Sequence, residues 1–154
     1  MISALLLSAL ILAEPRQLST DPDDRAMIHE LLEWIVASDG PGGYTAPDIE
    51  PVLIRVSSAA LGELVCGRPC PVKGYHPSGS YIVIVIRGLA PEVERHALVH
   101  ELVHYLQSRA STEWPDCVED YAREREAYRI QNKYRYKVQG YLGPADIPRV
   151  VCAP

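Results

Sequence analysis

Two histidines four residues apart, His100 and His104, enclose a glutamate in the sequence His-Glu-Leu-Val-His. Residues four apart on an α-helix lie on one face, so these side chains can offer two imidazole nitrogens to one metal ion. Glu101 lies one residue further round the helix, where its carboxylate can take a proton from a water on that metal but is poorly placed to be a ligand. We therefore interpret His100 and His104 as ligands of Zn²⁺ and Glu101 as a general base.

The surrounding sequence predicts the helix that this spacing needs. Pro91 and Glu92 are typical of a first helical turn, and apolar residues recur at helical spacing between positions 97 and 106. We expect the helix to end near Arg109. Gln107 lies close to that end, and we expect it to be exposed to solvent.

A catalytic zinc site usually has three protein ligands and one open position, so a third ligand is expected from another element. Asp116 and Glu119 form a capping box that predicts a second helix downstream. On it Glu124 and Ala127 share a face, and a small residue beside a ligand allows two helices to approach closely. Glu126 is rotated by about 200° from Glu124, so both cannot bind the same ion. We predict Glu124 as the third ligand and keep Glu126 as the alternative.

The His100 to His104 motif followed by the Glu124-x-x-Ala127 pattern resembles the gluzincin metallopeptidases, relatives of thermolysin. The resemblance implies zinc-dependent peptide hydrolysis, with a zinc-bound water activated by Glu101 and a peptide or protein as substrate. It also implies a zincin-like fold, in which an edge strand binds an extended peptide above the motif helix. Tyr81–Ile86 would be that edge strand. No glycine and third histidine follow His104, which excludes the metzincin pattern.

Two other interpretations start from the same residues. The protein could be a secreted, non-enzymatic zincin-like interaction protein that binds a partner peptide at the Tyr81–Ile86 edge strand. The presence of Glu101 favours the enzyme, because a purely structural domain needs no base at this position. A structural zinc site is the third interpretation, but two histidines and one glutamate leave an open position, as in catalytic sites.

A peptidase also needs a hydrogen-bond donor for the developing oxyanion. Four residues are candidates by type alone: Tyr105, Tyr121, Tyr128 and His76. His96 lies one turn before the first proposed ligand, where it could support that ligand.

The beginning of the chain resembles a signal peptide. Residues 2–13 are 12 residues without a charge, which is too short to span a bilayer comfortably. We predict a signal peptide over residues 1–13, with cleavage after Ala13, and no stable membrane span after processing. The expected location is therefore periplasmic or secreted, and the alternatives are a buried N-terminal helix and a cytoplasmic protein.

Four cysteines are consistent with export, because an even number in a secreted domain indicates disulfides. We predict the pairs Cys66–Cys70 and Cys117–Cys152. A four-cysteine zinc site is less favoured, since only one closely spaced pair is present. A reduced, cytosolic set is the remaining alternative.

Length and composition indicate one domain over residues 14–154 with enough apolar residues for a core. The net charge of −5 gives no indication of a nucleic-acid partner. The predicted elements give an α+β fold, a minimal zincin-like domain in which a small sheet packs on the motif helix and on the following Glu-bearing helix. Tyr81–Ile86, the strongest strand, is apolar on both faces and should be covered on both sides, or on one side by substrate.

Overall fold

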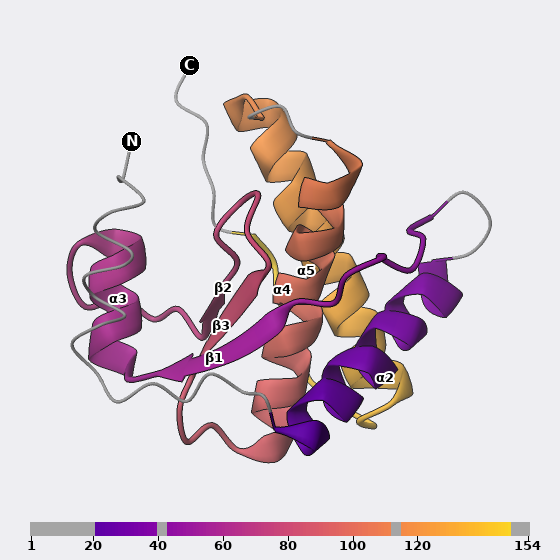
Figure 1. Ribbon diagram of the computed structural model, residues 1–154, viewed down its shortest axis with the longest axis horizontal. Helices are drawn as coiled ribbons and strands as arrows, with labels where there is room; N and C mark the ends of the chain where they lie inside the picture. The colour runs from indigo at the N-terminus through magenta and orange to yellow at the C-terminus, as the bar shows by residue number, and fades with distance from the viewer. Residues whose placement is uncertain (1–20, 40–42, 112–114, 149–154) are drawn as a thin grey trace.

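The computed structural model describes residues 21–39, 43–111 and 115–148 of the chain. These residues form four helices and three strands, which confirms the predicted α+β class (Figure 1). In chain order the elements are α2 (Pro22–Asp39), β1 (Val52–Val56), α3 (Ser58–Cys66), β2 (Gly74–Tyr75), β3 (Ile82–Ile86), α4 (Pro91–Ala110) and α5 (Cys117–Lys137).

Two helix starts depend on side-chain caps. The Ser57 hydroxyl accepts a hydrogen bond from the Ala60 N–H at 3.1 Å, and α3 begins at the next residue. The Asp116 carboxylate accepts from the Glu119 N–H at 2.8 Å, which confirms the predicted cap of α5. These caps satisfy backbone donors that the first helical turn leaves without partners.

The sheet has the strand order β1-β3-β2, so the expectation that Tyr81–Ile86 forms an edge strand is wrong. β3 pairs in parallel with β1, with Val52 opposite Ile82, and antiparallel with β2, with Tyr75 opposite Ile84. The short connection after β2 returns the chain as a hairpin on one side of β3, whereas the crossover through α3 leaves β1 on the other side. Among the described residues β1 and β2 are therefore the edges.

Both faces of β3 are buried, as its apolar sequence predicted. Val83 and Val85 belong to the main core together with Leu98 and Leu102 of α4. Ile84 faces the other way, into a smaller cluster with Leu61 of α3. α3 and α4 thus cover opposite faces of the sheet (Figure 1).

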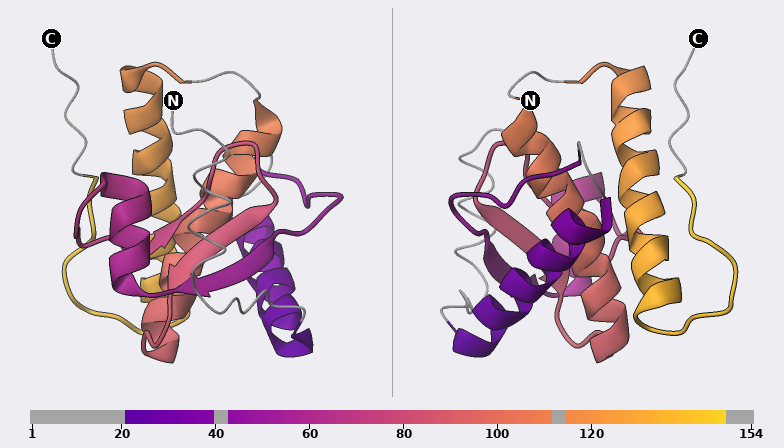
Figure 2. Two further views of the ribbon diagram at one scale, coloured as in Figure 1. Left: turned by 60° about the vertical axis from the view of Figure 1, so that its left-hand side comes forward. Right: turned by 90° about the vertical axis from the view of Figure 1, so that its right-hand side faces the viewer.

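The motif helix α4 is at the centre of the fold, against the sheet, α2 and α5. Figure 2 shows α4 and α5 side by side, with α2 crossing α4. Leu98, Leu102 and Val103 are completely buried. Burial of each such side chain contributes about 1.5–3 kcal/mol, so the backbone that carries the histidines is firmly held.

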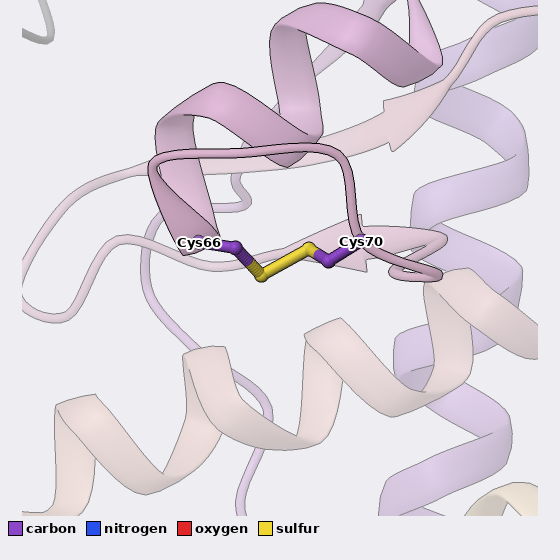
Figure 3. Close-up of a disulfide and its surroundings, with 2 residues drawn as sticks. All are labelled: Cys66 and Cys70. Carbon is purple, nitrogen blue, oxygen red and sulfur yellow. A yellow bond between two sulfur atoms is a disulfide. The ribbon is translucent and has the colours of Figure 1, made fainter.

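The predicted disulfide Cys66–Cys70 is present and closes the loop after α3 (Figure 3). The Cα atoms of the two cysteines are 6.4 Å apart, within the usual range for a disulfide. Gly67 makes this tight loop possible, since its φ of 63° is a left-handed conformation that other residues rarely adopt. The second predicted pair, Cys117–Cys152, includes a residue outside the described ranges.

The predicted signal peptide, residues 1–13, also lies outside the described residues. None of the helices in the described part of the chain has the length and apolar character needed to cross a membrane.

Candidate metal centre

Three predicted ligands converge between α4 and α5. His100 and His104 lie on consecutive turns of α4, and their Nε2 atoms are 3.1 Å apart. The Glu124 carboxylate approaches from α5, with Oε1 3.0 Å from His104 Nε2 and Oε2 3.4 Å from His100 Nε2. The structure therefore brings together two imidazole nitrogens and a carboxylate that could hold one metal ion.

The spacing of these donor atoms suits zinc. Zinc–nitrogen and zinc–oxygen bonds of about 2.0–2.1 Å in a tetrahedral arrangement place ligand atoms about 3.3 Å from one another. The three separations of 3.0, 3.1 and 3.4 Å lie close to that value. Two histidines and one glutamate also leave a fourth position open, which is typical of catalytic zinc.

A small residue allows the two helices to approach. Ala127 is completely buried and belongs to the main core, three residues after Glu124 on α5. A larger side chain there would separate α5 from α4 and withdraw the carboxylate from the histidines.

The charges of the ligands are strongly coupled. Burial alone would lower the pKa of His104, but the hydrogen bond to Glu124 and the charge of Glu101 outweigh it and raise that pKa to about 9. Burial would raise the pKa of Glu124, whereas its hydrogen bonds to His100 and His104 hold it well below its usual value. Without a metal, a proton on His104 thus compensates the negative charge of the Glu124 carboxylate. A divalent cation would compensate this charge more strongly.

Glu101 lies beside the ligands and is only 8 % exposed. Burial raises the pKa of its carboxyl group, His100 and His104 oppose this shift, and Glu124 adds to it. The backbone N–H of His76 donates a hydrogen bond to the carboxylate. A buried carboxylate with a raised pKa beside the candidate ligands is suited to act as a general base.

Gly74 on β2 makes room for this carboxylate. A Cβ atom at position 74 would lie 2.7 Å from Glu101 Cγ and 2.9 Å from Glu101 Oε1, which is closer than real contacts allow. Gly74 has no left-handed φ, so the close approach of Glu101 is the reason for a glycine here. Gly74 could not be recognised from the sequence, because the contact joins two elements far apart along the chain.

Glu126, the alternative ligand, is outside the group of converging donors. Its carboxylate accepts hydrogen bonds from the Tyr44 hydroxyl at 2.5 Å and from Gln107 Nε2 at 3.0 Å. Gln107 is buried rather than exposed to solvent, so that expectation is wrong. The reason is that α5 covers the last turns of α4, which the sequence alone did not reveal.

His76 is held through both ring nitrogens. Nδ1 donates to the Ile82 carbonyl oxygen at 2.9 Å, and Nε2 lies 3.0 Å from the Ser108 hydroxyl oxygen. Burial lowers the pKa of His76 to about 4, so the ring is neutral near pH 7. His76 therefore joins the β2–β3 hairpin to α4, and only its backbone contacts Glu101.

Among the tyrosine candidates, Tyr128 lies closest to a ligand. Its ring centroid is 4.5 Å from that of His100, and it lines the groove described below. The Tyr105 hydroxyl donates to the Ile49 carbonyl oxygen at 2.5 Å, and Tyr121 is partly exposed on α5. His96 donates from Nδ1 to the Gln139 side-chain oxygen at 3.2 Å.

A groove of about 1040 Å³ lies over the converging ligands. Residues 71–76, which include β2, line the groove. Tyr128 of α5 and the segment 145–147 also line it. His100, His104 and Glu124 therefore face a space that can hold a substrate several residues long.

Comparison with known protein families, curated proteins and solved structures found no match to this chain. The residues of the site are therefore the basis for inferring its chemical activity.

Proposed function

We propose that this protein is a zinc-dependent peptidase. The observation that carries the proposal is the convergence of His100, His104 and Glu124, with the buried carboxylate of Glu101 beside them, facing a groove. A structural metal site needs neither a carboxylate next to the ligands nor access for a substrate.

Three of the four residues would hold the metal, and the fourth would act as the base. The Nε2 atoms of His100 and His104 and the carboxylate of Glu124 would hold the zinc. When bound, zinc supplies a Lewis acid that polarises a carbonyl group and lowers the pKa of water. Glu101 takes a proton from the attacking water on its carboxylate and passes it to the leaving amine; the raised pKa of Glu101 makes it a better base for the first step.

The edge of the sheet supports a peptide as the substrate. Ile86 N–H donates to the Lys73 carbonyl oxygen, so strand geometry directs the backbone groups of Gly74 away from β3, to the outer edge. Gly74 lines the groove, and an extended peptide can add to such an edge by main-chain hydrogen bonds. In this proposal the edge strand that binds the peptide is β2 rather than Tyr81–Ile86.

We also propose that the protein is exported. A disulfide closes a five-residue loop, and disulfides persist in oxidising compartments.

Hydrolysis of fluorescence-quenched peptides by wild type and Glu101→Gln tests the proposed function. The variant keeps the shape of the side chain but cannot accept the proton, so we expect turnover to fall by about 10²–10⁴-fold with zinc content unchanged. Glu63→Gln, an exposed substitution on α3, is the matched control and should retain full activity. Equal turnover by Glu101→Gln and wild type would refute the proposed mechanism.

A further inference from the structure

Gln107 is a buried polar residue next to the metal centre that the His-Glu-x-x-His motif does not include. It lies one turn after His104 on α4 and is only 7 % exposed. Its side chain contacts His104 on one side and α5 on the other.

The hydrogen-bond partners of Gln107 fix the orientation of its amide group. Nε2 donates to the Arg123 carbonyl oxygen at 3.0 Å and to the Glu126 carboxylate at 3.0 Å. Both partners are acceptors without a proton, so the NH₂ group must face α5. The amide oxygen Oε1 therefore faces His104, 2.8 Å from its Nδ1 atom.

This orientation decides which nitrogen of His104 carries a proton when the ring is neutral. An amide oxygen only accepts hydrogen bonds, so Nδ1 must be the donor. The lone pair of the neutral ring is then on Nε2, the atom 3.1 Å from His100 Nε2 and 3.0 Å from Glu124 Oε1. Gln107 thus directs the lone pair of His104 to the point where the other two ligands meet.

Glu126 in turn is held by a third segment. The Tyr44 hydroxyl, in the segment between α2 and β1, donates to Glu126 Oε2 at 2.5 Å. Tyr44, Glu126, Gln107 and His104 therefore form a continuous chain of hydrogen bonds that links this segment, α5 and α4.

We propose that Gln107 is a positioning residue of the metal centre, which fixes the tautomer and ring orientation of His104, and that Glu126 acts through Gln107. The inference rests on the zinc site of the proposed function but not on hydrolysis. Loss of a hydrogen-bond partner of a metal-ligating histidine typically weakens metal binding by about 10–100-fold. We expect a loss of this size when Gln107 is replaced.

The test is zinc affinity, measured by competition with a chromophoric chelator, for wild type and Gln107→Met. Methionine is similar in volume but accepts no strong hydrogen bond. Asn132→Leu is the matched control: leucine has a shape similar to that of asparagine, and Asn132 is also a buried amide on a helix, which donates to the Asp146 carbonyl oxygen at 2.7 Å. We expect about 10–100-fold weaker zinc binding in Gln107→Met and unchanged binding in Asn132→Leu.

A double-mutant cycle separates positioning from general destabilisation. If Glu126 acts through Gln107, Glu126→Ala weakens zinc binding in wild type but not in the Gln107→Met background. If the Met variant fails to fold, Gln107→Asn replaces it, because the shorter amide cannot reach His104 and should show the same loss. Thermal unfolding without metal establishes that each variant is folded.

Wild-type zinc affinity in folded Gln107→Met, an equal loss in Asn132→Leu, or independent effects of Gln107→Met and Glu126→Ala would each overturn the inference. These outcomes can be distinguished from failure of the proposed function, because zinc binding and peptide cleavage are measured separately. A wild-type protein that binds zinc but cleaves no peptide refutes the peptidase, whereas the effect of Gln107 on zinc affinity can still be measured.

Discussion

Gly74→Ala should displace Glu101, the proposed general base, without contacting a proposed metal ligand. The new Cβ would lie 2.7 Å from Glu101 Cγ, whereas carbon atoms in ordinary contact are about 3.5–4.0 Å apart. Glu101 or β2 must therefore move by about 0.8 Å or more. Glu101 is buried and held by the His76 N–H, so relief of the clash by its side chain must disturb that hydrogen bond.

We expect Gly74→Ala to change turnover and stability but not zinc affinity. A misplacement of about 1 Å at a reacting group can reduce turnover by about 10²-fold, so we expect a kcat loss of that order. Overpacking should lower the free energy of unfolding by about 1–3 kcal/mol. Zinc affinity should stay near the wild-type value, because Glu101 is not among the converging ligands.

The assays are peptide turnover, zinc competition and urea unfolding of wild type and Gly74→Ala. Combining Gly74→Ala with Glu101→Asp provides a control, because the shorter carboxylate leaves room for the new Cβ. The alanine substitution should then cost less stability than it does in wild type, with a coupling of about 0.5–3 kcal/mol. Wild-type kcat in folded Gly74→Ala, together with additive stability effects, would refute the assigned contact.

Two further predictions concern the elements that surround the site. His76 is neutral when folded, with a pKa of about 4 against an ordinary value of 6.5, so between these values the unfolded chain binds a proton that the folded protein does not. The contribution of neutral His76 to the free energy of unfolding is therefore fully present above pH 6.5. This contribution is lost as the pH falls towards 4, by about 2–3 kcal/mol at pH 4.5. Urea unfolding of His76→Gln at pH 7 and pH 4.5 should show a pH-dependent loss smaller than that of wild type by this amount; an equal loss would contradict the assignment. Cys66→Ser/Cys70→Ser should lower the free energy of unfolding by about 2 kcal/mol, as expected for a five-residue loop, and leave zinc affinity unchanged. A large loss of zinc affinity in calorimetric titration of the double variant would show that the loop supports the metal centre directly.

Local structure was predictable wherever the sequence carries a local signal. Asp116 caps α5 by accepting a hydrogen bond from the residue three positions later, and the β-branched sequence of β3 indicates a strand covered on both faces. The pair of histidines on one face of α4 follows from helix geometry alone. The helix cap, the buried strand and the histidine pair depend only on residues close together in the sequence, and all three are present in the structure.

The order of the strands was not predictable in the same way. The connection through α3 places β2 two strand positions away from β1. The β2–β3 hairpin then places β3 in the position between them. Both arrangements satisfy the apolar pattern of Ile82–Ile86, so the pattern could not decide between a central and an edge strand.

The convergence of His100, His104 and Glu124 was predictable from the sequence, but the surroundings of these residues were not. Glu124 was favoured because Ala127 shares its helix face, and the structure places this pair against α4. Gly74 and Gln107 were missed because each is defined by a contact with another element, Glu101 for the first and α5 for the second. Their single-residue signals, a glycine in a strand and a glutamine near a helix end, fit many other roles.

The most direct test of the metal centre is the zinc content of purified protein, measured by elemental analysis after equilibration with zinc and removal of excess metal. Wild type, Glu124→Ala and Glu126→Ala should be compared, with circular dichroism to establish that each is folded. We predict one zinc per chain in wild type and in Glu126→Ala at saturation, and none in Glu124→Ala. A folded wild-type protein without zinc, or a Glu124→Ala variant that retains a full equivalent, would contradict the assigned ligands.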